Sequence, residues 1–443
     1  MAVTPASAGG ATDRPADGLP GFLDELRWRG LFHDATPGLA ARLATGRQIA
    51  AYNGFDPSGA SLHVGHLVPI TALVHLQQRG GRPVVLVGGG TGMIGDPSGT
   101  SAERNLLDHA TLEANLAGIR SQLERFLSFE GPNAAVMVNN LDWLSEISMI
   151  EFLRDVGKHF TIPYMLAKDS VQTRLGGGLS FTEFSYMLLQ AADFRHLYRT
   201  LGVELQMGGA DQWGNITAGL ELIRRTEEPP AGSSGEELAH ALAFTLLLDP
   251  GGAKFGKTAA GTSVWLDAER TTPYAFYQYW LGQADADVGQ LLRFFTLLDR
   301  PSIEALEAEQ ASRPEERPAQ RALALEVTAR VHGRDTALEA ERRSREVFSG
   351  GLLALDEAAF RAAIAELPRT TIDGSIVTAA ATAVAAGAVS SNGEARRLIA
   401  QGGLYVNDRR VTSVDEALPA PVHDRYWVLR TGKKNVRIVE RAG

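Results

Sequence analysis

The side chains of this sequence best placed to act on a phosphate are two histidines three positions apart. His63 and His66 stand in HVGH, shortly after a turn that contains DPSG (56–59). Residues with this spacing project from one face of a helix, so both imidazoles would lie together near its N-terminus. A helix N-terminus with two imidazole donors suits a polyphosphate, and Gly65 would let a ligand lie against the backbone. Taken alone, such a pair is more often a capping or packing feature of the surface.

A second candidate is the segment GGAKFGKT (251–258), in which Gly251, Gly256, Lys257 and Thr258 have the spacing of a Walker A loop. A phosphate cradle of that kind requires a helix that begins at the lysine. The following residues, AAGTSVWLD, predict a loop and then a β-like run instead. Without further support KFGKT would be a solvated basic loop, and a P-loop phosphotransferase stays as the alternative function.

A glycine-rich segment also matches a dinucleotide-binding pattern. Gly90, Gly92 and Gly95 have the spacing G-x-G-x-x-G directly after a predicted strand. That pattern requires the glycines to open a helix, so that its amide dipole faces a pyrophosphate. Pro97 and Gly99 follow at once, so we expect no helix start at Gly95 and no NAD site.

The long apolar segment 181–200 predicts a helix with a polar stripe. Tyr186, Gln190 and Asp193 stand at i, i+4 and i+7, on one face otherwise lined with Phe, Met, Leu and Ala. An unpaired buried carboxylate is strongly unfavourable, so Asp193 needs a partner. A phenol hydroxyl would fit. The residues alone leave open a second possibility, a surface pairing of this carboxylate with Arg195, His196 or Arg199.

The elements that must position these residues alternate between strand and helix. Strand, helix and strand are predicted over 48–54, 67–80 and 84–88, which is a βαβ unit and implies a parallel sheet. The alternation continues with a helix-rich stretch, then a strand, then a strand, tight turn and helix start, over 108–128, 136–140 and 205–215. The predicted fold class is therefore α/β.

The second part of the chain has a different pattern. Helix formers dominate from Thr272 to about Glu346, which predicts a small helical domain. Its aromatic run PYAFYQYW (273–280) is interpreted as core packing rather than a base-stacking platform. Helix, hairpin and hairpin follow over 393–401, 404–414 and 426–439. Residues 393–443 carry ten Lys and Arg against six Asp and Glu, a net of +4, whereas the whole chain carries −9. A basic end on an acidic body is a weak sign of nucleic-acid contact.

Composition bounds the class of protein. The 443 residues are 44% hydrophobic and 21% charged, which is typical of a globular chain of about two to four domains. The absence of cysteine excludes disulfides, thiolate zinc sites, iron–sulfur clusters and a cysteine nucleophile. No apolar run reaches the ~18 residues of a transmembrane helix, and residues 1–20 lack the features of a secretory signal. We expect a disordered leader over 1–20 and a cytoplasmic protein without membrane contact.

Several ordered blocks together resemble one enzyme family. HVGH resembles the HIGH motif of class I aminoacyl-tRNA synthetases, and KFGKT (254–258) resembles their KMSKS motif as the tyrosyl branch has it. The blocks GFDPSGASLHVGH, GMIGDPSG, VGKHF, SFTEFSYMLLQ and GGADQWGNITAGLELIR are similar to those of the bacterial tyrosyl enzymes. The resemblance extends from about Gly21 to the end of the chain. It implies a ligase that joins tyrosine to tRNA(Tyr), first activating tyrosine with ATP to tyrosyl-adenylate and pyrophosphate.

The resemblance implies a role for each matching residue. Tyr52 and Asp193 would bond the hydroxyl of tyrosine, while Asp96, Tyr186 and Gln190 would hold its ammonium group and Gln206 would support the pocket. The ATP-binding residues would be Asn53, Gly54, Asp56, Gly65, Asp211, Gln212 and Lys257. The residues that stabilise charge on the phosphates would be His63, His66, Lys254, Lys257 and Thr258. The RNA-binding residues of the basic module would be Arg396, Arg397, Arg409, Arg410, Lys433 and Lys434.

The resemblance also implies the organisation of the molecule. A Rossmann-like catalytic domain with a helical insertion would occupy 21–265, a helical domain 266–346, a linker 347–375 and a small α+β RNA-binding domain 376–443. The partners would be L-tyrosine, ATP with its Mg²⁺, tRNA(Tyr) and a second copy of the chain, with no protein-bound metal or organic cofactor. The alternatives are an inactive RNA-binding protein built on the same fold and a tryptophanyl enzyme. The second is disfavoured because Tyr52 and Asp193 suit a phenol better than an indole.

Overall fold

The computed structural model describes most of the chain and divides it into two compact units. The described residues are 17–57, 59–96, 98, 109–229, 238–248, 255–256, 262–348, 351–365, 367–373, 376–432 and 435–442. They fall into one unit within 1–272 and 279–331 and a second within 273–278 and 332–443. Each unit has its own sheet.

The first unit is built on a six-stranded sheet in the order β1-β6-β5-β2-β3-β4. Five strands run parallel, and the edge strand β1 pairs antiparallel with β6. The bounds are β1 (Phe32–Ala35), β2 (Ala50–Phe55), β3 (Arg82–Val87), β4 (Val136–Asn139), β5 (Val203–Gly209) and β6 (His240–Phe244). The predicted strands at 48–54, 84–88, 136–140 and 205–215 are confirmed, and so is the parallel sheet.

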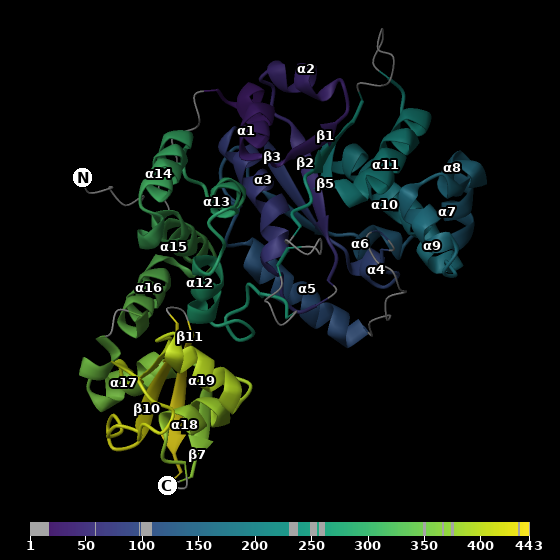
Figure 1. The fold of residues 1–443 in the computed structure, drawn as a ribbon. Helices are drawn as coiled ribbons and strands as arrows, with labels where there is room; N and C mark the ends of the chain where they lie inside the picture. Colours follow the sequence, from purple (N-terminus) through teal and green to yellow (C-terminus); the bar gives the residue numbers. More distant parts are fainter. Residues whose placement is uncertain are drawn as a thin grey trace. The chain divides into compact units, whose positions relative to one another are not determined.

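Helices cover both faces of this sheet because its central strands are apolar on both faces. All but one of the side chains of β2 and of β3 are buried. α3 (Leu67–Gln78) packs on β2 and β3, whereas α10 (Phe181–Leu201) and α11 (Trp213–Thr226) pack on each other and on β5. Figure 1 shows these two groups on opposite sides of the sheet, with α7 (Met149–Asp155), α8 (Ile162–Leu166) and α9 (Asp169–Leu175) beyond α10.

Short and C-terminal helices complete the first unit. Those before β6 are η1 (Leu19–Gly21), α1 (Phe22–Arg29), α2 (Leu39–Ala44), η2 (Val64–His66), α4 (Gly89–Gly92), α5 (His109–Leu123), α6 (Leu141–Leu144), η3 (Gly157–His159) and η4 (Ala210–Gln212). The later ones are α12 (Pro273–Leu281), α13 (Val288–Phe295), α14 (Arg300–Ser312), η5 (Pro314–Glu316) and α15 (Pro318–His332). The first six residues of α12 and the last residue of α15 fall in the second unit.

The long helix α10 has clear ends that its sequence specifies. The hydroxyl of Ser180 accepts a hydrogen bond from the backbone N–H of Glu183 at 3.2 Å, which caps the N-terminus. Gly202 ends the helix in the left-handed conformation, at φ 64°. Between these ends the helix spans the predicted segment 181–200, with its apolar residues packed against α11 and the sheet.

The second unit carries a five-stranded sheet in the order β7-β11-β10-β8-β9. Its strands are β7 (Arg369–Ile372), β8 (Leu404–Val406), β9 (Arg409–Arg410), β10 (Tyr426–Thr431) and β11 (Asn435–Arg441). Its helices are α16 (Arg334–Phe348), η6 (Gly351–Ala354), α17 (Glu357–Ile364), α18 (Ala379–Ala385) and α19 (Asn392–Ala400). The predicted helix and two hairpins of the basic module are confirmed as α19, β8–β9 and β10–β11.

The segment 347–375, predicted as a linker, carries secondary structure in its described part. It holds η6, α17 and β7, and β7 pairs in parallel with β11. Phe360 and Ile364 of α17 belong to an apolar cluster with Tyr426 and Val428 of β10. The described part of this segment is therefore a part of the second unit's core rather than an extended connection, and the other predicted domain boundaries stay predictions.

Candidate active site

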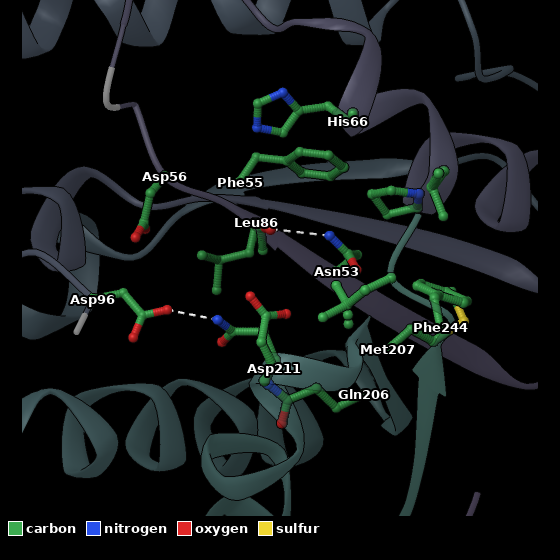
Figure 2. Close-up of a pocket in the computed structure, with 18 of the residues that line it drawn as sticks. Asn53, Phe55, Asp56, His66, Leu86, Asp96, Gln206, Met207, Asp211 and Phe244 are labelled. Atoms are coloured by element: carbon green, nitrogen blue, oxygen red, sulfur yellow. Dashed lines mark hydrogen bonds between the residues drawn. The ribbon is translucent and has the colours of Figure 1, made fainter. Parts of the chain in front are cut away.

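A cavity of about 500 Å³ lies where the parallel strands of the first unit end. It is lined by Tyr52 to Asp56 from the end of β2 and by Gln206 to Gly209 from the end of β5, and α10 adds Tyr186, Gln190 and Asp193. Ligands of open α/β sheets bind at this carboxyl edge. Figure 2 shows the polar side chains converging on the cavity. The predicted face of α10 is thus confirmed as a wall of the cavity.

One end of the cavity presents an unpartnered phenol. Tyr52 is 2% exposed, its ring packs against Phe194 with the ring centroids 5.4 Å apart, and its hydroxyl has no hydrogen-bond partner among the described residues. Burial and the charge of Asp193 raise the pKa of this hydroxyl well above its ordinary value. Gln206 lies beside Tyr52 in the sheet, and its buried Oε1 also lacks a partner. A ligand with a polar end would satisfy these atoms.

The carboxylate of Asp193 is held rigidly next to that phenol. Asn140 Nδ2 donates to Oδ2 at 2.9 Å and Trp143 Nε1 donates to Oδ1 at 2.8 Å. Burial raises the pKa of Asp193 to about 7, against the lowering effect of these two hydrogen bonds. The surface pairing with Arg195, His196 or Arg199 that the sequence left open does not form, because Asp193 is buried and turned into the cavity.

Two further carboxylates form a network around the middle of the cavity. Tyr186 donates its hydroxyl to Asp56 Oδ2 at 2.9 Å, and Thr91 donates to Asp56 Oδ1 at 3.1 Å. Gln212 Nε2 donates to Asp96 Oδ2 at 2.6 Å (Figure 2). These bonds join residues predicted for the ammonium group of the amino acid to residues predicted for the nucleotide. The two predicted subsites therefore share one hydrogen-bonded wall.

The histidine pair has a defined arrangement at the other end. His63 Nδ1 accepts from the backbone N–H of Gly65 at 3.1 Å, and His66 Nδ1 accepts from the backbone N–H of His63 at 3.1 Å. A neutral imidazole whose Nδ1 accepts must carry its proton on Nε2, so both rings hold an Nε2–H donor. Burial and the neighbouring His63 lower the pKa of His66 well below its ordinary value. The pair therefore combines two neutral donors at the start of α3, in line with the predicted anion site.

The described part of the KFGKT segment lies directly against this histidine turn. A Cβ on Gly65 would come within 3.5 Å of Phe255 O, and one on Gly256 within 3.4 Å of Gly65 N. Gly256 O accepts from Val264 N at 3.0 Å, and Val264 O accepts from Val64 N at 3.0 Å. The two motifs that the sequence separates by almost two hundred residues are thus brought together. Lys254, Lys257 and Thr258 lie outside the described residues.

The same backbone pairing bears on the Walker A alternative. Trp265 forms an antiparallel bridge with His63, and Leu266 N donates to Leu62 O at 2.8 Å. Residues 262–266 are therefore extended where the described chain resumes after the lysine, as the sequence predicts. A P-loop fold would need a helix there.

The glycines of the GTGMIG segment have a packing role rather than a dinucleotide role. A Cβ on Gly90 would come within 2.9 Å of Leu144 Cδ1, and one on Gly92 within 2.9 Å of Pro57 Cδ. Just before the segment, a Cβ on Gly88 would come within 2.3 Å of Asp56 Oδ1. Gly95 has φ 86° and follows the end of α4, so no helix starts there, as predicted. These glycines let the turn after β3 approach the carboxylate network closely.

The nucleotide-side candidates also line the cavity. Asn53 donates to Gly54 O at 2.9 Å, and its buried Oδ1 has no partner among the described residues. Asp211 follows β5 in η4 and stands close enough to Gly209 that a Cβ there would meet its Oδ1 at 2.6 Å. Asp56, Asp96, Asp193 and Asp211 line the cavity, whereas its described lining contains no lysine or arginine. Such a site suits an ammonium group and needs added positive charge to hold phosphates.

Comparisons with known proteins identify the family. The family described as "tRNA synthetases class I (W and Y)" matches residues 44–349, and "Tyrosine--tRNA ligase SYY-like C-terminal domain" matches residues 359–439. The chain belongs to the class I tRNA synthetases. The predicted family and fold class are confirmed.

Individual relatives match this synthetase over almost its whole length. The tyrosine–tRNA ligase of Anaeromyxobacter dehalogenans is 50% identical over 428 residues, covering 95% of this chain and 100% of the relative. That of Geobacillus stearothermophilus is 47% identical, again covering 95% of this chain and 100% of the relative. The solved structure of a C-terminally truncated mitochondrial tyrosyl-tRNA synthetase from Aspergillus nidulans has TM-score 0.66 and 30% identity, covering 74% of this chain and 94% of that one.

Four residues of the synthetase site were missed by the sequence analysis. Asn140 and Trp143 hold Asp193, Thr91 bonds Asp56, and Asn215 Nδ2 lies 3.4 Å from Asp96 Oδ1. A signal was available for the first of them, because Asn140 follows directly on β4. Polar residues just after a parallel strand lie at the ligand-binding edge of the sheet.

The candidate RNA-binding residues of the synthetase lie in the second unit. Arg396 and Arg397 are exposed on α19, and Arg409 and Arg410 are exposed on β9. Arg410 lies over Gly402, just after α19, because a Cβ there would meet its guanidinium at 1.7 Å. Arg410 of the hairpin thus lies against the turn that follows α19, while Lys433 and Lys434 lie outside the described residues.

The described residues contain neither a candidate metal site nor a candidate membrane-spanning helix. Among them, no group of three or more His, Asp or Glu side chains is arranged to hold a metal ion. Within the same part of the chain, no helix combines the length and the apolar character needed to cross a membrane. The predicted absence of a protein-bound metal and the cytoplasmic location stay predictions.

Proposed function

We infer that this chain is a tyrosine–tRNA ligase. It activates L-tyrosine with ATP to tyrosyl-adenylate and pyrophosphate, and then transfers the tyrosyl group to the 3′ end of tRNA(Tyr). The tyrosine–tRNA ligases that cover 95% of the chain at about 50% identity support this function. The family carries out aminoacylation in these two steps.

One feature of the site explains why the substrate is tyrosine rather than phenylalanine or tryptophan. The hydroxyl of Tyr52 has no partner among the described residues, and the carboxylate of Asp193 faces the same buried end of the cavity. A substrate phenol would donate to Asp193 and accept from Tyr52, which satisfies both groups. Phenylalanine would leave the hydroxyl of Tyr52 without a partner and would bring no donor to the buried carboxylate of Asp193, so the pocket rejects it. An indole would offer one donor and no acceptor, so it would leave Tyr52 unpaired.

The carboxylate-rich wall supports the placement of the other end of tyrosine. The ammonium group lies against Asp96, Tyr186 and Gln190, where the negative charge of Asp96 and the nearby Asp56 favours a cation. The tyrosine carboxylate then points along the cavity toward the histidine turn. Its oxygen attacks the α-phosphorus of ATP while the bond from that phosphorus to pyrophosphate breaks.

Neutral hydrogen-bond donors and added cations stabilise the negative charge on the phosphates. The Nε2–H groups of His63 and His66 donate to phosphate oxygens as negative charge moves toward pyrophosphate. Positive charge comes from Lys254 and Lys257 of the KFGKT segment and from the Mg²⁺ that ATP carries. Asn53, Asp211 and Gln212 bind the nucleoside, with Gly54 and Gly65 leaving room for it, and Thr258 assists at the phosphates.

The second substrate and the quaternary structure follow from other surfaces. The exposed arginines of the second unit and Lys433 and Lys434 bind tRNA phosphates, which makes the affinity depend on salt. A homodimer buries the apolar side chains that α7, α8 and their surroundings expose. These are Met149, Ile150, Leu153, Ile162, Leu175 and Phe181, which are 45–75% exposed. The dimer acts in the cytoplasm.

Amino-acid-dependent exchange of pyrophosphate into ATP tests the function. Tyrosine should support exchange, and phenylalanine and tryptophan should support far less at equal concentration. Exchange without preference for tyrosine would contradict the substrate assignment. Absence of exchange, together with retained tRNA binding, would favour an inactive RNA-binding protein. Sedimentation of Ile150→Glu beside the unaltered chain tests the dimer, since a charge on this face should yield monomers.

A further inference from the structure

We propose that Phe295 is a positioning residue for the nucleotide step, acting through Phe255 of the KFGKT segment. Phe295 ends α13, lies fully buried and lines the same cavity as the histidine pair. No motif of the sequence singles it out. The proposal rests on the proposed function, because it concerns how that reaction's ATP half is held in place.

Phe295 and Phe255 belong to an aromatic cluster that also contains Tyr279 and Trp280. The rings of Phe255 and Phe295 are stacked, with centroids 5.6 Å apart and planes at 25°. Phe255 also contacts Trp280 and Tyr279, each at 5.9 Å, and Trp280 packs on Phe295 at 4.8 Å. Phe255 is only partly buried, whereas Phe295 and Trp280 are 0% exposed. Phe295 and Trp280 therefore form a buried aromatic surface against which the ring of Phe255 packs.

The end of α13 that carries Phe295 is held by a buried arginine, Arg29, and a partly buried one, Arg330. Arg29 of α1 donates to the carbonyls of Arg293, Thr296 and Leu298 at 2.9, 2.8 and 2.7 Å. Arg330 of α15 donates to the carbonyl of Phe295 itself and, at 3.2 Å, to the hydroxyl of Thr71 on α3. The carbonyls at and just after this helix C-terminus are thus bonded by two arginines from two other helices. The ring of Phe295 has little freedom to move relative to α3.

Through its backbone, Phe255 connects this aromatic cluster to the phosphate end of the cavity. Its N–H donates to Leu247 O at 2.9 Å, and its carbonyl lies against Gly65 between the two histidines. Leu247, Phe255 and Phe295 all line the cavity, together with Val68 and Pro69 of α3. A change in the ring at 295 would therefore shift Phe255 and the wall beside the histidine turn. At the tyrosine end, in contrast, Tyr52 packs its ring on Phe194, and Asp193 is bonded by Asn140 and Trp143.

The expected consequence is a selective defect in the use of ATP. A stacked aromatic pair contributes about 0.5–1.5 kcal/mol beyond its buried area, which corresponds to roughly a two- to tenfold change. Phe295→Leu should therefore raise the KM for ATP in pyrophosphate exchange by about that factor. The dissociation constant for tyrosine, measured without ATP, should stay within about twofold of the parent value, because the pair does not touch the tyrosine end.

Phe294→Leu is the matched control. Phe294 is the neighbouring residue of α13, is equally buried, and is not part of the cavity lining. Its replacement should lower the unfolding temperature at least as much as Phe295→Leu and leave the KM for ATP unchanged. If both variants raise the KM for ATP equally, or if Phe295→Leu weakens tyrosine binding as much as ATP use, Phe295 has only a structural role and the proposal is overturned.

A double variant tests whether the two phenylalanines act together. If Phe295 acts through Phe255, the loss in kcat/KM for ATP of Phe255→Leu/Phe295→Leu should be smaller than the product of the two single losses. Multiplying losses would mean independent roles and would overturn the proposal. Tyrosine-dependent exchange by the parent protein is measured in the same series, so failure of the function itself is seen separately from failure of this inference.

Discussion

Replacement of Tyr52 by phenylalanine should stabilise the protein and weaken its substrate binding at the same time. The hydroxyl of Tyr52 is buried and has no partner in the described part of the chain, so its removal relieves a desolvation penalty in the unliganded protein. The ring and its contact with Phe194 remain, since phenylalanine keeps the aromatic body. In the complex the same change removes one hydrogen bond to the phenol of the substrate.

The magnitudes follow from these two roles. An unpaired buried polar group costs about 1–3 kcal/mol, so Tyr52→Phe should raise the free energy of unfolding by about 1 kcal/mol. For a unit of this size that is an increase of roughly 1–2 °C in the unfolding temperature. A neutral hydrogen bond contributes about 0.5–1.5 kcal/mol, so the dissociation constant for tyrosine should rise roughly two- to tenfold. Discrimination against phenylalanine should fall by a similar factor.

Tyr186→Phe, in the same cavity, should have the opposite effect on the free energy of unfolding. Tyr186 is also buried, but its hydroxyl donates to Asp56 at 2.9 Å. Its removal deprives a carboxylate of a donor and should lower stability by about 1.5–3 kcal/mol. Urea unfolding without ligands and tyrosine titration of both variants would test the pair. If Tyr52→Phe proves less stable than the parent, its hydroxyl has a partner in solution and the explanation of tyrosine selectivity loses its basis.

Three further predictions concern titration and close packing. Because the unliganded Asp193 has a pKa of about 7 and the phenol donates to the ionised form, the tyrosine dissociation constant should rise about tenfold from pH 8 to pH 6; a flat profile would contradict this. Trp143→Phe removes a donor to that carboxylate, so the pKa and the midpoint of the profile should move upward in the same titration. Gly65→Ala would place a Cβ 2.8 Å from the ring of His63, so single-turnover adenylate formation should slow about tenfold to a hundredfold with tyrosine affinity unchanged; equal losses in both would refute it.

The parts of the site that the sequence predicts are those set by local periodicity. His63 and His66 are three apart, and Tyr186, Gln190 and Asp193 follow the period of one helix, so their common faces follow from spacing alone. The strands around them can also be predicted, because β2 and β3 are short apolar runs. Gly54 lies near the end of β2, and Gly88 follows β3 directly.

The parts that the sequence could not predict depend on contacts between distant segments. Asn140 and Trp143 bond Asp193, which lies about fifty residues later in the chain. No pattern in VNNLDW indicates that these side chains pair with Asp193. The bond from Tyr186 to Asp56 likewise joins two motifs that were assigned to different substrates. The sequence did not predict that 347–375 contributes to the core of the second unit. Its strand β7 has only four residues, too few for a clear sequence pattern, and it is recognisable as a strand only through its pairing with β11.

The hydrogen bonds of Arg29 have a consequence for how the protein is made. This arginine lies near the start of the chain, yet the carbonyls of Thr296 and Leu298 that satisfy it come 267 and 269 residues later. A ribosome adding about 5–20 residues per second needs roughly 15–60 s to deliver them. The guanidinium of Arg29 must therefore wait for these carbonyls until the segment that carries Thr296 and Leu298 has been translated.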